Sequence, residues 1–125
     1  MTRYKYLSWD SVELEDLNPL LKRQFMVGEN VMIARVLLKK GCVVPLHNHR
    51  NEQVTYILEG ALKFRHGEQI VVRAGEVLCI PPNVPHEAVA LEDTVDLDIF
   101  TPPREDWIAK TDAYLRCRQP VPGNQ

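Results

Sequence analysis

Residues 41–60 of the chain read GCVVPLHNHRNEQVTYILEG. This block places His47 and His49 two positions apart and Gln53 four positions later, with a glycine at each end. Imidazole nitrogens are good ligands for divalent transition metals, and a two-residue step along a strand puts both rings on one face. The block therefore predicts part of a metal-binding site.

A second block, GEVLCIPPNVPHEAVA at residues 75–90, contributes His86 after a Pro-Pro-Asn turn. Three of the four histidines of the chain thus fall inside two glycine-bounded blocks. A third imidazole and a side-chain oxygen would complete one side of a metal centre and leave positions open for a substrate. The fourth histidine, His66, precedes Gly67 in a predicted hairpin turn, where we expect a solvated ring.

The side-chain oxygen is a choice between Glu52 and Gln53. If a strand continues through residues 54–58 with strict alternation, Gln53 lies on the face of Thr55 and Ile57, and Glu52 lies on the opposite face. A loop after the histidines would break this parity, so both remain candidates, with Gln53 favoured by its spacing. Three imidazoles and an amide are all neutral, which leaves a divalent ion its full charge as a Lewis acid and as a docking point for an anion.

Mixed nitrogen and oxygen ligands do not select one metal, so nickel, iron, manganese, zinc and cobalt all remain possible. Cys42 and Cys79 lie outside the two ligand sets, and we expect both to be small buried apolar residues.

Composition predicts one domain over residues 1–125, because a chain of this length with 45% apolar and 26% charged residues can bury a hydrophobic core. A net charge of −2 gives no electrostatic reason to expect nucleic acid as a partner. No run approaches the roughly 20 apolar residues of a membrane helix, and the first ten residues do not resemble a secretion signal. Three widely spaced cysteines without a Cys-x-x-Cys pair suit a reducing compartment, so we expect a cytoplasmic protein.

Short runs rich in Val, Ile, Leu and aromatic residues stop at Gly or Pro turns at close intervals, which is typical of a β-sandwich or barrel. The strands predicted from these runs cover residues 24–27, 31–38, 53–58, 62–65, 70–73, 77–80 and 94–100. They define a core of about residues 24–101, preceded by a strand extension over 1–23. Residues 102–125 follow as a short C-terminal helix, predicted over Arg104 to Leu115, and a tail that is disordered or lies against a partner.

The spacing Gly-x5-His-x-His-x3-Gln-x6-Gly, followed by Gly-x5-Pro-x-Asn-x2-His, resembles the paired motifs of the cupin superfamily between Gly41 and about Ala90. The resemblance implies a double-stranded β-helix, the jelly-roll barrel of cupins, with a metal in one mouth. Gln53 stands where most cupins have glutamate. Asn83 replaces a glycine and Ala90 a common asparagine, both at turn or filler positions.

Residues 94–100 alternate, with Val95, Leu97 and Ile99 on one face and Asp96, Asp98 and Phe100 on the other. The pattern alone favours an apolar face in the core and aspartates in water. A barrel with a functional cavity also has a polar interior, and the presence of Phe100 beside the aspartates favours that second interpretation. Both stay open.

The segment Asp-x-Phe-x-Pro-Pro-Arg-x-Asp, together with Gln53 in the glutamate position, is similar to the KdgF family of pectin and alginate degradation. The resemblance implies that 4,5-unsaturated uronates are opened to linear keto forms, with the metal held by His47, His49, Gln53 and His86. It further implies Asp98 as the catalytic acid–base group, Phe100 as an apolar wall for the sugar, and Arg104 as the ligand of the substrate carboxylate. A dication nearby is expected to favour the charged form of Asp98. For Arg104, a surface ion pair with Glu105 or Asp106 fits equally well.

The sequence thus predicts a metal-dependent isomerase or lyase acting on a small anionic sugar acid. An iron(II) cupin dioxygenase, a non-catalytic cupin that binds a sugar or acid, and a different metal-assisted isomerase are the alternatives. Small jelly rolls expose sheet edges, so we also expect a symmetric homodimer in which N-terminal strands add to a neighbour's sheet.

Overall fold

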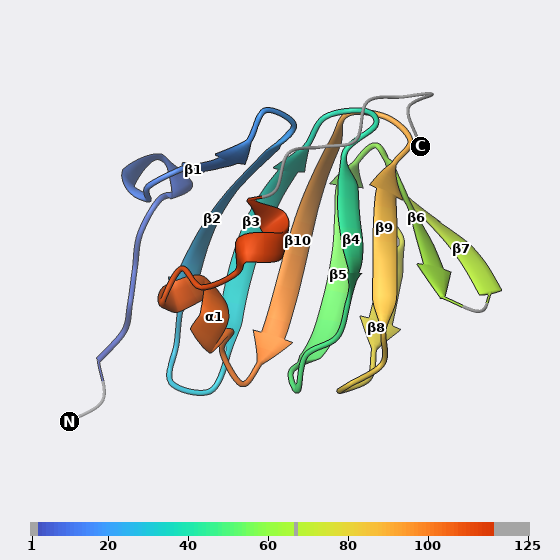
Figure 1. Ribbon diagram of the computed structural model, residues 1–125. Coiled ribbons are helices and arrows are strands. Elements are labelled where there is room, and N and C mark those ends of the chain that lie inside the picture. Colours follow the sequence, from blue (N-terminus) through green and yellow to red (C-terminus); the bar gives the residue numbers. More distant parts are fainter. Residues whose placement is uncertain (1–2, 67, 117–125) are drawn as a thin grey trace.

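The computed structural model describes residues 3–66 and 68–116, which fold into two antiparallel sheets (Figure 1). The six-stranded sheet contains, in spatial order, β1 (Glu15–Asn18), β2 (Leu21–Val27), β3 (Met32–Leu38), β10 (Thr94–Thr101), β5 (Glu52–Glu59) and β8 (Val77–Ile80). The four-stranded sheet contains β4 (Val43–His47), β9 (His86–Ala90), β6 (Ala61–His66) and β7 (Glu68–Arg73). Three short helices complete the fold: η1 (Trp9–Ser11), α1 (Glu105–Ile108) and η2 (Ala113–Leu115).

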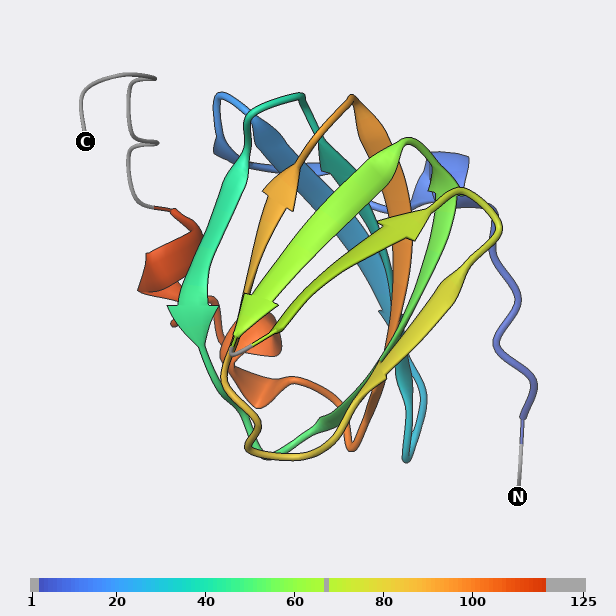
Figure 2. The ribbon, with the colours of Figure 1, turned by 90° about the vertical axis from the view of Figure 1, so that its right-hand side faces the viewer.

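The two sheets face each other around one core, with the four-stranded sheet in front in Figure 2. Many neighbouring strands are distant in sequence: β10 lies between β3 and β5, and β9 lies between β4 and β6. These crossovers build the jelly roll, which confirms the predicted all-β class with its short C-terminal helix. His66 ends β6, in the β6–β7 hairpin predicted for it.

Strand alternation turns polar side chains into the barrel. On β10, Asp96, Asp98 and Phe100 are buried, whereas the intervening apolar residues are only half-buried and face outward. The interpretation that puts the aspartates in water is therefore wrong. The reason is topological, because β10 is a central strand and Asp98 lies in register between Ala34 of β3 and Thr55 of β5, both fully buried.

The N-terminal region forms part of the same sheet. β2 begins at Leu21, three residues before the predicted start, and pairs along its length with β3. β1 pairs in turn with β2 of the same chain. β4 and β9, which carry two of the histidines, were not among the predicted strands. Pro45 lies within β4, where the pairing with β9 is irregular, so the sequence signal for a strand is weak there.

The helix predicted over Arg104 to Leu115 is shorter than expected and is followed by a separate turn of 3-10 helix. α1 ends at Ile108, and Lys110 then has a φ of 58°, a left-handed conformation that ends an α-helix. The predicted tail over 119–125 lies outside the described residues. Within residues 3–66 and 68–116, no helix is long and apolar enough to cross a membrane.

The two cysteines within the described residues are free thiols in different environments. Cys42 is fully buried, as predicted, and burial raises the pKa of its thiol to about 12. Cys79 is exposed, so the expectation of a buried residue is wrong there. Its position on β8 alternates with buried Ile80 and faces out of the barrel.

Candidate metal centre

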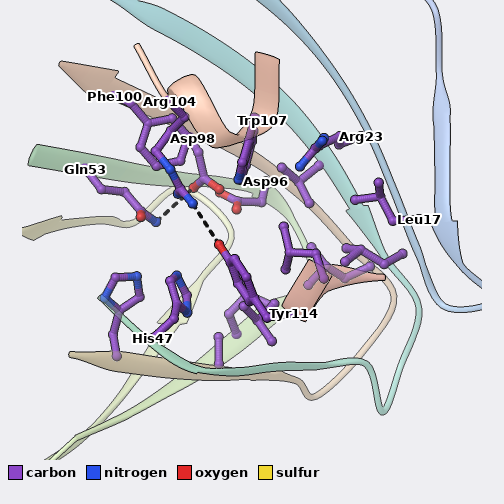
Figure 3. Close-up of a pocket in the computed structure, with 18 of the residues that line it drawn as sticks. Leu17, Arg23, His47, Gln53, Asp96, Asp98, Phe100, Arg104, Trp107 and Tyr114 are labelled. Atoms are coloured by element: carbon purple, nitrogen blue, oxygen red, sulfur yellow. Dashed lines mark hydrogen bonds between the residues drawn. The ribbon is translucent and has the colours of Figure 1, made fainter. Parts of the chain in front are cut away.

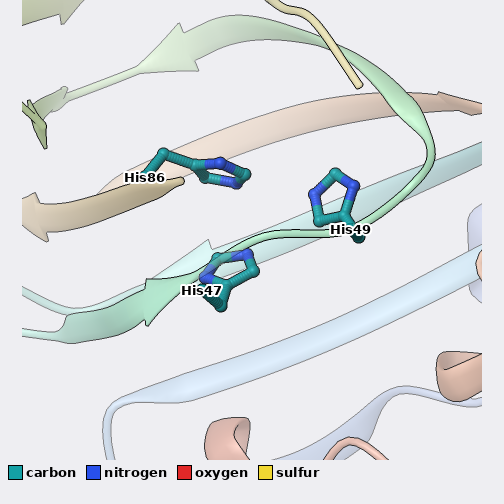
Figure 4. Close-up of side chains that lie close together, drawn as sticks. All are labelled: His47, His49 and His86. Atoms are coloured by element: carbon teal, nitrogen blue, oxygen red, sulfur yellow. The ribbon is translucent and has the colours of Figure 1, made fainter. Parts of the chain in front are cut away.

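Three histidines from separate segments meet in one mouth of the barrel (Figure 4). His47 ends β4 and lies directly opposite His86, which begins β9, with ring centroids 4.3 Å apart. His49 lies in the loop after β4 and not on a strand as predicted, yet its ring centroid is 5.5 Å from that of His47 and 5.1 Å from that of His86. One ring nitrogen from each residue lies within 4.8 Å of the others. We call these residues the histidine cluster.

The hydrogen bonds of two of the rings, His47 and His86, fix which nitrogen is the potential ligand. In every ring Nδ1 lies at hydrogen-bonding distance from a backbone carbonyl two residues away, and a carbonyl can only accept. The three pairs are His47 with Pro45 at 2.8 Å, His86 with Val84 at 2.9 Å, and His49 with Asn51 at 3.1 Å. In His47 and His86, Nδ1 therefore carries the proton, and Nε2 carries the lone pair that can bind a metal, an arrangement typical of metal-binding histidines. In His49 both ring nitrogens face an acceptor, because Nε2 also lies 3.1 Å from the Gln53 amide oxygen.

Gln53 points into the barrel, whereas Glu52 is exposed, so the parity argument for Gln53 holds. The Gln53 amide nitrogen donates to Thr55 Oγ1 at 2.9 Å, and this hydroxyl donates to Asp98 Oδ1 at 2.7 Å. The amide oxygen is thereby turned toward His49 Nε2, 3.1 Å away. Without a metal, His49 Nε2 can donate to this oxygen, whereas a cation bound between the two groups would take the lone pairs of both.

The charge state of the rings also suits a metal. Burial lowers the pKa of His47 to about 3, with His86 and His49 adding to the effect. Burial, followed by the positive charge of Arg104, lowers the pKa of His49 to about 4. Both rings are therefore neutral near pH 7. Two nitrogens bound to one ion at about 2.1 Å each are at most roughly 4.2 Å apart, so small ring rotations close the cluster. The residues fit a single divalent ion.

The loop that carries His49 is tied at both ends. Asn51 Nδ2 donates to the carbonyls of Pro102 at 2.5 Å and Pro103 at 3.2 Å. The backbone N–H of Asn83 donates to the His49 carbonyl at 2.8 Å, and Asn83 has a φ of 65°. Asparagine tolerates this left-handed conformation better than most residues, which explains how it replaces a glycine. Asn51 was missed by sequence reasoning, since nothing in the chain links it to the Pro-Pro segment.

Asp98 belongs to a buried pair of carboxyl groups. Burial and the negative charge of Asp98 raise the pKa of Asp96 well above its ordinary range, and the two side chains are hydrogen-bonded. Burial also raises the pKa of Asp98, although hydrogen bonds from Asp96 and Thr55 oppose the shift. Two close carboxyl groups resist double ionisation, so the pair retains a proton. Without a metal, burial thus disfavours the charged form of Asp98, and the effect of a nearby dication stays a prediction.

Arg104 is buried rather than on the surface, although Asp106, one of the two predicted surface partners, is its ion-pair partner. Nε donates to Asp106 Oδ1 at 2.9 Å and Nη2 donates to Oδ2 at 2.8 Å. The guanidinium carbon lies 5.1 Å from the ring centroid of Phe100 and 4.8 Å from that of Trp107. The Nε and Nη2 groups of Arg104, which could have bound a substrate carboxylate with two hydrogen bonds, are therefore already engaged. Nη1 is the remaining direct donor for such a carboxylate.

A cavity of about 50 Å³ joins the mouth of the barrel to its interior (Figure 3). Its polar lining includes His47, Gln53, His86, Asp98 and Arg104, all predicted from the sequence as site residues. Phe100 also lines it, with its ring nearly perpendicular to that of His49 at a centroid distance of 5.7 Å. Tyr114 on η2 lines the same cavity, and sequence reasoning missed it, because no spacing relates this residue to the histidine blocks.

The comparisons with known proteins agree with this geometry. A family model described as "Cupin domain" matches residues 34–101. The structure of an RmlC-like cupin from Shewanella frigidimarina is 32% identical with a TM-score of 0.78, over 84% of this chain and 96% of that one. The structure of KdgF from a Halomonas species is 28% identical with a TM-score of 0.77, over 82% of this chain and 99% of that one.

A more distant structure, a variant of Bacillus subtilis oxalate decarboxylase, is 20% identical with a TM-score of 0.70, over 85% of this chain and 34% of that one, and shares the fold alone. None of the curated proteins matches the chain in sequence. The family match spans more than half of the 125 residues and includes all three histidines of the cluster. The chain therefore belongs to the cupin family.

Proposed function

We propose that the protein is a metal-dependent cupin enzyme that opens the ring of a 4,5-unsaturated uronate to give the linear keto form. The observation that carries this proposal is the hydrogen-bonded series from Gln53 through Thr55 to Asp98, which puts a buried acid–base group beside the histidine cluster. The likeness to a KdgF structure over nearly the whole length of that protein adds support.

The metal would be held by His47, His49, Gln53 and His86. Nickel, iron, manganese, zinc or cobalt would each suit this donor set. A bound divalent ion would supply Lewis-acid stabilisation of negative charge on the substrate and would attract its carboxylate.

Asp98 would move the proton. Its carboxylate takes the proton of the anomeric hydroxyl, the aldehyde forms and the ring C–O bond breaks, which leaves an enolate. The same carboxyl group then returns the proton to the enol carbon, so the reaction is a net isomerisation without another reactant. Burial raises the pKa of Asp98, and the hydrogen bond with Asp96 opposes this shift. This balance suits a group that must both accept and donate a proton.

Arg104 and Phe100 would bind the substrate. The buried guanidinium provides a positive charge, and its Nη1 can donate to a carboxylate while Asp106 and Tyr114 hold the other edge. Phe100, packed 5.0 Å from Trp107 between ring centroids, provides a rigid apolar wall for a sugar face.

The buried carboxyl pair and the buried Arg104 favour this reaction over an iron(II) oxygenase. A buried carboxyl pair and a buried arginine are groups for proton transfer and anion binding. Oxygen consumption by the iron-loaded protein would measure the alternative directly.

The test is a spectroscopic assay that follows loss of the conjugated double bond of an unsaturated uronate, with metal-loaded and chelator-treated protein. Asp98→Asn should reduce turnover by about a hundred- to ten-thousandfold while ligand binding is retained. Glu52→Gln is the matched control, because Glu52 is acidic but faces outward beside Gln53. Ring opening no faster than the spontaneous reaction with any of the five metals, or full activity of Asp98→Asn, would refute the proposal.

We also propose a symmetric homodimer through the outer face of the six-stranded sheet. Large apolar residues are exposed there, on β5 (Tyr56 and Leu58) and on β8 (Val77). Burial of such a face between two copies would be favourable. Sedimentation of the wild type and of Tyr56→Lys should distinguish dimer from monomer, and a wild type that stays monomeric at all concentrations contradicts the proposal.

A further inference from the structure

Tyr114 packs against His47, at one side of the histidine cluster. Its ring lies 4.7 Å from that of His47 between centroids, at an angle of 31°, and its hydroxyl accepts from Arg104 Nη2 at 2.8 Å. Figure 3 shows the tyrosine spanning the space between these two residues. With Tyr114 in this position, the cavity of about 50 Å³ has room for roughly four water molecules. A ring-form sugar acid is several times larger than that.

The segment that carries Tyr114 is held by contacts on both sides of this residue. Before it, Asp112 is fully buried and accepts from Arg23, which is also fully buried. After it, the carbonyl of Leu115 accepts from Asn18 Nδ2 at 2.9 Å. These contacts join the C-terminal segment to β1 and β2, on the side of the barrel opposite β8.

The same segment can move without opening a sheet. No residue of 109–116 pairs with a strand, and the backbone hydrogen bonds at its two ends are local, from Lys110 N–H to the Trp107 carbonyl at 3.3 Å and from Arg116 N–H to the Ala113 carbonyl at 3.0 Å. The left-handed Lys110 is exposed and marks the end of α1. Residues 109–116 therefore form a flap attached to the barrel by side-chain contacts.

We propose that Tyr114 is a specificity-determining gate, which admits only small ligands to the histidine cluster until the flap at residues 109–116 lifts. The choice of a sugar acid as the larger ligand rests on the proposed function, but the gate itself does not. A small and a large ligand can both carry a carboxylate, so an experiment can vary the size of the ligand and keep its binding group unchanged.

The experiment compares formate with galacturonate on the cobalt(II)-loaded protein, with binding followed by the visible cobalt absorption. Both probes present a carboxylate, and galacturonate lacks the double bond needed for turnover. If the open state is a minor population of at most about 10%, Tyr114→Ala should strengthen or accelerate galacturonate binding by at least about tenfold. Formate binding should change far less.

Two further variants sharpen the result. Tyr114→Phe keeps the ring but removes the hydrogen bond to Arg104, so galacturonate should remain excluded as in the wild type. Tyr4→Ala is the matched control, because Tyr4 is fully exposed on the N-terminal segment. Equal effects of Tyr114→Ala on formate and galacturonate, or no effect on either, would overturn the gate.

A second measurement needs neither metal nor turnover. In the metal-free protein, hydrogen exchange of the Leu115 and Arg116 amides should be faster than that of β10, because lifting the flap leaves the strands paired. If the Leu115 and Arg116 amides exchange only when the whole protein unfolds, the proposed gate would also be overturned. Failure of the uronate assay with a positive result here would refute the proposed function and leave the gate intact.

Discussion

Two polar regions of this protein, one around the buried Arg23 and one around the three histidines, differ in their chemistry. One is an ion cluster, defined as Glu15, Arg23, Lys110, Asp112 and Arg116, which joins β1 and β2 to the C-terminal segment. In it opposite charges meet: Arg23 Nε lies 2.9 Å from a Glu15 oxygen, and Arg116 Nε lies 3.2 Å from an Asp112 oxygen. The other is the histidine cluster with Gln53, in which neutral groups converge and the Gln53 amide oxygen lies 3.1 Å from His49 Nε2.

The difference separates a structural role from a functional one. Buried opposite charges satisfy one another, so the ion cluster needs no further component to hold its two chain segments together. Neutral acceptors gathered around one point repel weakly and gain only when a cation binds among them. Polar burial alone therefore does not indicate a site, but converging groups of the same kind do.

The largest effect should come from breaking the ion cluster. Arg23→Met leaves Glu15 and Asp112 without their shared buried partner, and we expect the free energy of unfolding to fall by about 3–5 kcal/mol. Chemical denaturation measures this value. Lys22→Ala is the neighbouring control, because the Lys22–Asp16 pair is exposed and should contribute less than about 1 kcal/mol. Equal losses in the two variants would remove the structural role assigned to the cluster.

A smaller, ligand-dependent effect should mark the histidine cluster. At a metal concentration about 100 times its Kd, the free energy of unfolding should rise by about 2.7 kcal/mol. Thermal unfolding with and without each metal measures the gain. Arg23→Met should keep this gain despite its lower stability, whereas His49→Ala should lose it. A gain that persists in His49→Ala would assign the metal to another site.

The smallest effect of the three should be that of acid on the His49 ring alone, and acid should affect the two clusters in different pH windows. Folding lowers the pKa of His47 to about 3 and of His49 to about 4 from 6.5. The unfolded chain therefore takes up more protons, and this contribution to stability is lost as pH falls below 6.5. Burial alone would raise the pKa of Glu15, but hydrogen bonds from Arg23 and Lys110 hold it below 4.5, so its contribution is lost only at more acidic pH.

Denaturation of the metal-free protein between about pH 7 and pH 5 can isolate the histidine contribution. His49→Gln should show a shallower loss of stability than the wild type over that range, since the titrating ring is gone. Asp96 and Asp98 titrate in the opposite sense, but they are present in both proteins. Identical slopes would contradict the assigned pKa shift of His49.

Much of this site follows from local sequence patterns. The glycine-bounded blocks identify the histidines, because their spacing reflects the turns that bring β4 and β9 together. Strand parity distinguishes Gln53 from Glu52, since β5 keeps its alternation from its first residues. Gly60 marks the turn after β5, where a Cβ atom would lie 2.4 Å from the Asp93 carbonyl oxygen and only glycine fits.

The remaining features depend on contacts that no local pattern encodes. The alternation over 94–100 is the same whichever face is buried, and only the position of β10 between β3 and β5 turns Asp96 and Asp98 inward. Arg23 and Asp112 are 89 positions apart in the chain, so their pairing is set by tertiary structure. Tyr114 reaches the histidine cluster for the same reason.

The most direct test is anomalous scattering from crystals of metal-free protein soaked in turn with nickel, manganese, iron, cobalt and zinc, recorded at the absorption edge of each metal. We expect one peak per chain, bonded to Nε2 of the three histidines of the cluster and to the amide oxygen of Gln53. A barrel mouth without a peak for any of these ions, or rings that point away from a common centre, would contradict the metal site on which the proposed chemistry depends.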